Sequence, residues 1–424
     1  MIDIKEIREN PERFKKAAKD KGFNVDIDKL LEIDSALRKL KQLLQDAATY
    51  KNQVGKTIPN LSGNEKQKAI NQLAELKQQE VEHNEDVKKL QPQFDSLMLE
   101  VPQPAADDVP LGKDDTENVE IKRVGQVRKF DFEPKDHVQL GLALDIIDIE
   151  RGVKIAGTRN YFLKGDGALL HWAVLRFAID FMAAKGYTPM SPPLLMKYET
   201  MLGTGFYPGS EEQTYRTIDE LNLSGTAEVP VTAYHKDEIL SADELPKKYV
   251  ALSTCFRREA GAAGKDTYGL YRIHQFDKVE QVIICKNSIE ESKKLHAEIL
   301  DNSEQVLQAL ELPYRVVNVC AGDLGRGQVQ KFDIETWMPS RKNYGETHSA
   351  SRFYEFQARR LNLRYKDPKT KKNLFCHTMN NTVIASPRIL IPILELYQNA
   401  DGSVTIPKVL RPYMNSKEKI TRNS

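Results

Sequence analysis

Apolar residues recur every three or four positions through most of the first hundred residues, with charged and amide side chains between them. One such stripe begins at Leu30 and ends near Ala47, and a second runs from Ile70 to Val101. This spacing is typical of long helices that pair along a narrow seam. A short turn-forming cluster at residues 57–63 separates the stripes, and so short a link requires the two helices to run antiparallel.

The predicted hairpin over residues 27–100 buries its own apolar stripes and needs no globular body beside it. At ~1.5 Å per residue, helices of this length reach roughly 45 Å. Asn10 and Pro11 indicate a helix start ahead of the hairpin, and Pro92 predicts a kink near the base of the second helix.

A stretch rich in proline and aspartate, residues 101–115, follows the hairpin and predicts a linker. We therefore expect a helical hairpin domain over 1–104 and a second domain over 105–424. In the second domain the pattern predicts helices near 137–150, 167–185 and 287–311. Shorter β-rich runs predict strands at 249–257, 271–285, 314–319, 329–337, 346–357 and 374–386. Antiparallel strands flanked by helices indicate an α+β fold.

Composition excludes several classes of protein. The chain has 424 residues, 40% of them hydrophobic, and no uninterrupted apolar run approaches the ~20 residues of a membrane span. Its charged start predicts no secretory leader. The four cysteines are scattered and form no metal-spaced pair, which predicts a reducing cytoplasm and no zinc site. The 62 basic and 61 acidic residues leave a net charge of +1, which taken alone argues against nucleic-acid binding.

The richest candidate chemistry lies in a predicted β-hairpin over residues 250–280, with a loop at 260–269. Alternation in the return strand places five side chains on one face: Arg272, His274, Phe276, Lys278 and Glu280. The guanidinium of an arginine can bind a phosphate through two parallel hydrogen bonds. The aromatic ring of Phe276 offers a stacking surface for a flat base, and a carboxylate can bind an ammonium group. A solvated strand with incidental charges is the alternative interpretation.

A shorter segment, residues 223–230, contains Thr226 and Glu228. If this segment is extended, both side chains share one face. A helix cap of the form Thr-x-Glu has the same appearance, so both interpretations stay open at this point.

The third segment combines a cation with oxygen ligands. Arg388 precedes a strongly apolar run, and a cation at the start of a buried segment needs an anion such as phosphate beside it. Glu346 and Ser349 offer the hard oxygen ligands that Mg²⁺ takes. His348 and His377 stand without metal-spaced partners, which argues against zinc.

Together these segments resemble the bacterial type of seryl-tRNA synthetase, a family of class II aminoacyl-tRNA synthetases. Residues 256–259, Phe-Arg-Arg-Glu, are similar to the Phe-Arg-x-Glu of motif 2, and residues 380–395 resemble motif 3. Residues 225–230 resemble that family's serine loop, and residues 186–193 resemble motif 1. The chain start, the helical hairpin and residues 332–337 also match, so the resemblance runs nearly end to end.

The resemblance implies a serine–tRNA ligase. Such an enzyme joins L-serine to ATP as seryl-adenylate and then transfers serine to the 3′ end of tRNA-Ser, and of tRNA-Sec as well. It implies Mg²⁺ as cofactor, ATP as substrate and no zinc. The hairpin would grip the long variable arm of tRNA-Ser, with candidate contacts at Lys39, Lys41, Lys51, Lys56, Lys66 and Lys68. A cytoplasmic homodimer without membrane contact is expected, with Pro192 and Pro193 at its interface.

The family's functional residues map onto the matching positions of this chain. Arg257 and Arg388 would be the catalytic cations. The implied serine site consists of Thr226, Ala227, Glu228, Arg257, Glu280 and Thr382. The implied ATP site consists of Arg257, Arg258, Glu259, Phe276, Glu346, Thr347, His348, Ser349 and Arg388. Glu346 and Ser349 would bind Mg²⁺.

The chain departs from the family pattern around motif 3. Where the family has Asn-Gly-Ser-Gly, residues 380–383 read Asn-Asn-Thr-Val, which keeps a hydroxyl at Thr382 and loses glycine's backbone freedom at Val383. The usual Ser-Ser-Cys-Ser-Asn is replaced around Ser349, and Pro387 stands in place of a glycine.

Two other functions compete with this interpretation. A ligase that charges a carrier protein with an amino acid has the same catalytic fold, but it lacks the helical hairpin and uses zinc. A non-catalytic tRNA-binding paralogue would keep the hairpin. Retention of Arg257, Glu259, Glu280, Glu346 and Arg388 argues against the paralogue.

Overall fold

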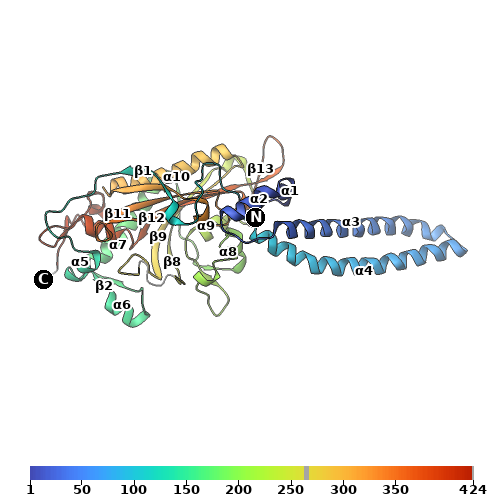
Figure 1. The fold of residues 1–424 in the computed structure, drawn as a ribbon, viewed down its shortest axis with the longest axis horizontal. Coiled ribbons are helices and arrows are strands. Elements are labelled where there is room, and N and C mark those ends of the chain that lie inside the picture. Colours follow the sequence, from blue (N-terminus) through green and yellow to red (C-terminus); the bar gives the residue numbers. More distant parts are fainter. Residues whose placement is uncertain (262–266, 423–424) are drawn as a thin grey trace. The chain divides into compact units, whose positions relative to one another are not determined.

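The computed structural model describes residues 1–261 and 267–422, so the middle of the predicted 260–269 loop lies outside the described residues. The chain forms two compact units, Met1–Pro104 and Ala105–Ser424. Figure 1 shows the course of each unit, with helices as coils and strands as arrows.

The first unit is helical throughout. Its helices are α1 (Ile4–Glu9), α2 (Pro11–Asp20), α3 (Ile27–Thr57) and α4 (Gly63–Glu100). The Asn10 side chain accepts a hydrogen bond from the backbone N–H of Arg13, and Pro11 occupies the first position of α2, as the sequence predicts for a helix start.

Helices α3 and α4 run side by side and antiparallel, which confirms the predicted hairpin (Figure 1). Leu30, Ile33 and Leu37 are buried near one end of the pair. Farther along, Lys41 Nζ lies 2.9 Å from Gln91 Oε1, and Lys51 Nζ lies 2.6 Å from Glu80 Oε2. Helix α4 continues without a break through Pro92.

The second unit is built on an eight-stranded sheet in the order β1-β10-β11-β12-β15-β9-β8-β4. Every neighbouring pair is antiparallel except β4 and β8, which run parallel at one edge. Its strands are β1 (Val119–Val124), β4 (Thr188–Met190), β8 (Lys247–Phe256), β9 (Gln275–Cys285), β10 (Tyr314–Asn318), β11 (Gln330–Met338), β12 (Asn343–Tyr354) and β15 (His377–Ser386).

Short strands and helices complete this unit. The helices are α5 (His137–Ala143), α6 (Ile149–Ala156), α7 (Asp166–Ala184), α8 (Tyr198–Thr204), α9 (Glu228–Thr232), α10 (Ile289–Ala309), α11 (Phe356–Arg360) and α12 (Leu390–Leu396). The remaining strands are β2 (Ile147–Asp148), β3 (Phe162–Leu163), β5 (Leu195–Met196), β6 (Asn222–Leu223), β7 (Ile239–Ser241), β13 (Arg364–Lys366), β14 (Asn373–Phe375), β16 (Val404–Thr405) and β17 (Lys419–Ile420). An antiparallel sheet flanked by helices confirms the α+β class.

Helices α7 and α10 cover one face of the central strands (Figure 1). The amides of Gln281 on β9 and Asn381 on β15 both donate to the Ile299 carbonyl of α10. Because side chains alternate along a strand, the neighbours of these amides, among them Glu280 and Thr382, point to the opposite face. That opposite face carries the candidate site.

One predicted helix was wrong in its second half. The expected helix over 137–150 ends at Ala143, with Leu144 as its C-cap, because Asp145 adopts a left-handed backbone conformation with φ of 58°. Asp148 then caps a separate helix, α6, by accepting from the backbone N–H of Arg151. The apolar spacing alone does not reveal this break.

Helix α7 is long and apolar enough to span a membrane when judged by length and composition alone. It buries Leu170, Val174, Ala178 and Met182 in the hydrophobic core of the second unit. A buried core helix can have the same length and apolar composition as a membrane span, so these two properties are weak evidence for a span.

Candidate active site

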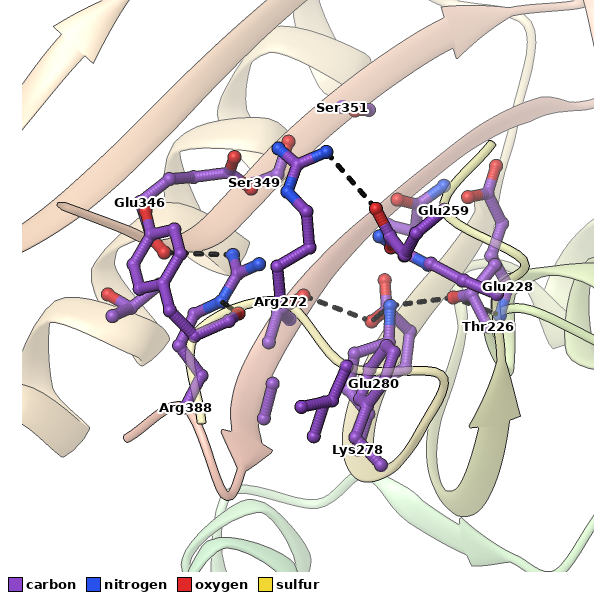
Figure 2. A pocket seen from close by; sticks show the side chains of 18 of the residues that line it. Thr226, Glu228, Glu259, Arg272, Lys278, Glu280, Glu346, Ser349, Ser351 and Arg388 are labelled. Atoms are coloured by element: carbon purple, nitrogen blue, oxygen red, sulfur yellow. Dashed lines mark hydrogen bonds and ion pairs between the residues drawn. The ribbon is translucent and has the colours of Figure 1, made fainter. Parts of the chain in front are cut away.

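A cavity of about 220 Å³ lies on the sheet face opposite α10. Charged and polar side chains from β9, β12 and β15, together with the segments that follow β6 and β8, line it (Figure 2). The sequence-predicted residues that line it are Thr226, Glu228, Arg257, Glu259, Phe276, Glu280, Glu346, Thr347, Ser349, Thr382 and Arg388.

One end of the cavity holds a buried network of cation, carboxylates and hydroxyls. Lys278 Nζ lies 2.7 Å from Glu280 Oε2 and 2.7 Å from the hydroxyl of Thr226 (Figure 2). The Thr382 hydroxyl donates to the same Glu280 carboxylate at 3.3 Å. Such a network is stable in the interior only because its charges are paired, and it presents several hydrogen-bonding groups to a small polar ligand.

Glu228 stands at the start of helix α9, beside this network. Thr226 precedes that helix, and its hydroxyl accepts from the backbone N–H of Glu228 at 3.2 Å, so the cap interpretation of Thr-x-Glu applies while both side chains also face the cavity. Gln357 donates to the Glu228 carboxylate at 2.9 Å. Burial, reinforced by repulsion from Glu280, raises the pKa of Glu228 to about 7.

Arg257 follows directly on β8, and its guanidinium lies over the ring of Phe276, 5.2 Å from the ring centre. Its Nε donates to the Gly225 carbonyl at 3.3 Å. Nearby, the Glu259 carboxylate pairs with Arg272 at 3.1 Å (Figure 2). The cavity wall here combines an arginine fork, an aromatic face and a carboxylate.

Glu346 and Ser349 reach the cavity together because β12 contains a bulge. Residues three apart on a regular strand face opposite sides of the sheet. The pairing with β11 shifts between Ile334 and Glu335, which leaves Thr347 as an extra residue in β12. Glu346 and Ser349 therefore both line the cavity.

The electrostatic surroundings of Glu346 favour its charged form. Burial opposes its ionisation, but Arg388 and Lys331 outweigh burial, so the pKa of Glu346 lies below its ordinary value. Asp333 is paired directly opposite Ser349 on β11, and burial raises the pKa of Asp333 to about 7. Among the described residues, its buried Oδ1 has no hydrogen-bond partner.

Arg388 closes the other end of the cavity. Its Nε donates to the Tyr271 carbonyl and its Nη1 to the Glu346 carbonyl, each at 3.0 Å. The guanidinium also lies 4.4 Å from the centre of the Tyr271 ring. These contacts hold the head of Arg388 beside Glu346, as Figure 2 shows.

Three predicted site residues do not line the cavity. Ala227 is fully buried between Thr226 and Glu228, and Arg258 is exposed, with its backbone N–H bonded to the Gln213 carbonyl. His348 is buried, and its ring contacts Thr347 and Val383 instead. Burial lowers the pKa of His348 to about 4.

Pro192 and Pro193 lie just beyond β4, at one edge of the sheet. Beside this edge is a shallow hollow with a mostly apolar wall, lined by Trp172, Leu175, Arg176, Ile179, Pro189, Met190, Ser191 and Leu252. The Trp172 side chain at its rim is 61% exposed. Across the described residues, no group of three histidine, cysteine or carboxylate side chains is arranged to hold a metal ion.

Arg272 and Lys278, which the alternation along the return strand predicted as candidate side chains, both line the cavity, whereas Tyr271, Gln328, Ser351 and Asn380 line it without having been predicted. Lys278 alternates with Phe276 and Glu280 on β9, which brings all three side chains to the cavity. His274 shares that spacing but precedes β9, and its ring bonds to the Arg257 carbonyl at 2.9 Å. No local pattern points to Gln328.

Comparison with known proteins agrees with this geometry. Residues 1–104 match the seryl-tRNA synthetase N-terminal domain, and residues 212–397 match the tRNA synthetase class II core domain (G, H, P, S and T). A serine–tRNA ligase of Deinococcus radiodurans is 46% identical, over 99% of this chain and 98% of the relative. Another from Dictyoglomus thermophilum is 42% identical over 99% of both chains.

Two solved structures resemble this chain closely. Seryl-tRNA synthetase from Pyrococcus horikoshii, complexed with ATP, has a TM-score of 0.94 and 35% identity and covers 100% of both chains. The cytoplasmic serine–tRNA ligase of Naegleria fowleri, in complex with AMP, has a TM-score of 0.88 and 31% identity, over 98% of this chain and 96% of the other. The chain belongs to the seryl-tRNA synthetase family.

Proposed function

We propose that the central cavity is where this serine–tRNA ligase activates L-serine with ATP. The observation that carries the proposal is the arrangement of Arg257 and Arg388 in one cavity whose other end holds the buried Lys278–Glu280 pair. Two cations suit a polyphosphate, and a polar pocket with carboxylates suits a small amino acid. The two structural relatives are complexes with ATP and with AMP, which supports a nucleotide as a ligand of this chain.

In the proposed complex ATP lies along the wall formed by motif 2. Arg257 bridges the α-phosphate of ATP and the serine carboxylate. The adenine ring stacks on Phe276, and Glu259 contacts its edge. Arg388 binds the γ-phosphate. To do so, its guanidinium gives up its hydrogen bonds to the Tyr271 and Glu346 carbonyls.

Glu346 and Ser349 would hold Mg²⁺ against the phosphates. A carboxylate and a hydroxyl are the oxygen ligands that this ion prefers. Asp333 is paired opposite Ser349 on β11, and its buried Oδ1 has no hydrogen-bond partner among the described residues. When bound, the ion neutralises phosphate charge.

Serine would occupy the end of the cavity formed by Thr226, Glu228, Glu280 and Thr382. Its ammonium group meets the carboxylates, and its hydroxyl bonds to Glu280 and Thr382. Alanine lacks this hydroxyl and would leave those buried groups unpaired, so discrimination of roughly 10⁴ or more is expected without editing.

The chemistry then requires positioning rather than a protein nucleophile. A serine carboxylate oxygen attacks the α-phosphorus and releases pyrophosphate, which gives seryl-adenylate. Arg257 and Arg388 stabilise the charge that develops on the phosphates. In the second step a hydroxyl of the 3′-terminal ribose of tRNA attacks the acyl carbon and releases AMP.

The helical hairpin is proposed to bind the long variable arm of tRNA-Ser. Exposed lysines along α3 and α4 suit contacts to the phosphate backbone, which read RNA shape rather than base sequence. A modest local basic surface is sufficient for this, so a net charge of +1 does not oppose tRNA binding.

The experiment that tests this function measures transfer of labelled serine to purified tRNA. We expect tRNA-Ser with its variable arm to be charged, and the same tRNA with the arm shortened to a few nucleotides to be charged at least tenfold more slowly. Transfer of labelled serine to a carrier protein, without transfer to tRNA, would overturn the proposal.

The Glu228 carboxyl predicts a pH dependence of serine binding. Gln357, Asn380, Glu280 and Lys278 all contribute to its pKa, which lies at about 7. Only the ionised carboxylate attracts the serine ammonium group, so the KM for serine is expected to fall as pH rises through 7. Between pH 6 and pH 8 the fall should approach tenfold, since ionised Glu228 rises from roughly a tenth to most of the population.

Glu228→Gln is the matched variant, because it keeps the shape and the contact to Gln357 while removing the titration. Its KM for serine should be high and nearly constant over the same pH range. An equal pH dependence in both proteins would show that another group is responsible.

We also propose that the chain forms a homodimer through the sheet edge at β4. Pro192 and Pro193 lie there, and the neighbouring hollow exposes Trp172 and Leu252. Aromatic and aliphatic side chains grouped at an uncovered sheet edge are typical of subunit interfaces.

A further inference from the structure

Strands β12 and β15 are paired along only part of their length. Within the described residues, the paired stretch runs from Ala350 and Asn381 to Tyr354 and Thr378, and its Ser351–Asn380 pair lines the cavity. Glu346 on β12 and Thr382 on β15 lie past the Ala350–Asn381 end of this stretch, where the described residues of the two strands are no longer paired with each other. These are the strands that carry the proposed ATP side and part of the proposed serine side.

Each strand also has a bulge at this point. Thr347 is the extra residue of β12 against β11, and Val383 is the extra residue of β15 against β9. The second bulge has the same effect as the first, because Thr382 and Ala385 both line the cavity although they are three residues apart. The two bulges thus decide which side chains face the ligands.

The imidazole of His348 connects these two bulges. Its Nε2 lies 3.0 Å from the Val383 carbonyl oxygen, and its Nδ1 lies 2.8 Å from the Thr347 hydroxyl. A carbonyl oxygen only accepts, so Nε2 carries the proton and Nδ1 is the acceptor. The Thr347 hydroxyl is in turn 2.8 Å from that of Thr336 on β11, so the chain of contacts extends across three strands.

A second contact spans the same gap, from Arg388 Nη1 to the Glu346 carbonyl. In the proposed reaction Arg388 turns toward the γ-phosphate of ATP and gives up that contact. His348 is buried and does not line the cavity, so its contacts are undisturbed by a ligand.

We propose that His348 is a positioning residue for adenylate formation, which holds the bulge at Thr347 and the bulge at Val383 at a fixed separation. This inference rests on the proposed function. It assigns no contact between the imidazole and a substrate. Its effect is to keep Glu346 and Ser349 aligned with Arg388, and a misplacement of about 1 Å at a reacting centre can cost about 10²-fold in rate.

Three variants separate the hydrogen bonds from simple filling of space. His348→Phe keeps the ring and removes both bonds. His348→Gln places an amide N–H near the position of Nε2, whereas His348→Asn is too short to reach the Val383 carbonyl. His296→Phe is the matched control, because His296 is also buried and its Nε2 also bonds to a β12 carbonyl, that of Ala350, at 3.0 Å.

The measurement is serine-dependent pyrophosphate exchange, with kcat and both KM values, alongside the Tm of each variant. We expect kcat to fall at least tenfold in His348→Phe and His348→Asn, with a raised KM for ATP. The KM for serine should stay within about twofold, because Thr382 and Glu280 remain paired on β15 and β9. His348→Gln should recover to within about threefold of the wild-type kcat, and His296→Phe should lower Tm without lowering kcat.

A wild-type kcat in His348→Phe would overturn the inference, as would equal losses in the Gln and Asn variants. If His348→Phe does not fold, the kcat of His348→Gln compared with that of His348→Asn still tests the inference. Absence of exchange in the wild-type protein would instead contradict the proposed function, so the two failures are distinguishable.

Discussion

Replacing Arg388 with alanine is expected to slow serine-dependent pyrophosphate exchange by roughly 10²–10³-fold, which corresponds to about 3–4 kcal/mol of transition-state stabilisation. The guanidinium stands beside Glu346 at the end of the cavity where the γ-phosphate is proposed to lie. Arg388→Lys should recover only part of the rate, since a lysine keeps the charge but lacks the planar fork.

Arg341→Ala is the matched control for this variant. Its guanidinium packs on the same Tyr271 ring, 4.3 Å from the ring centre, but Arg341 does not line the cavity. We expect exchange within about threefold of wild type. Near-normal exchange in Arg388→Ala would discredit the alignment of residues 380–395 with motif 3, and an equal loss in both variants would point to damage at Tyr271.

Removing most of the hairpin is expected to separate the two steps of the reaction. Residues 41 and 91 face each other across α3 and α4, so residues 41–91 can be replaced by a short glycine–serine turn. Leu30, Ile33, Leu37 and Met98, which are buried at the retained end, keep their packing. Charging of tRNA-Ser should fall at least 100-fold, because the phosphate contacts along the hairpin are lost.

Serine-dependent exchange by the same shortened protein is the internal control. It should stay within about threefold of wild type, since every residue that lines the cavity belongs to the second unit. Charging that persists at the wild-type rate would refute the assignment of the hairpin to tRNA. Loss of both activities would show that the two units depend on each other.

The fold was largely predictable because its signals are periodic. The stripe from Leu30 to Ala47 can only be a helix seam, and the alternation of Phe276, Lys278 and Glu280 can only be a strand face. The break at Asp145 escaped prediction because a single left-handed residue interrupts a helical pattern without changing its apolar spacing. Local backbone conformation of this kind is set by tertiary packing.

Many of the residues that line the cavity could be predicted from the sequence, but the geometry that brings them together could not. A spacing of three between Glu346 and Ser349 contradicts a shared strand face, and only the bulge at Thr347 resolves the contradiction. The bulge at Val383 is likewise visible only in the structure, where the Val383 backbone carbonyl accepts from His348. Bulges depend on the register of neighbouring strands, which one strand's sequence does not contain.

The central claim is that ATP and serine react in this one cavity. Serine-dependent exchange of labelled pyrophosphate into ATP by the full-length protein tests it most directly. We expect rapid exchange with serine. Exchange with alanine should be slower by roughly 10⁴-fold, because alanine lacks the hydroxyl that Glu280 and Thr382 would bind. Exchange that is absent with serine, or that prefers glycine or alanine, would contradict it.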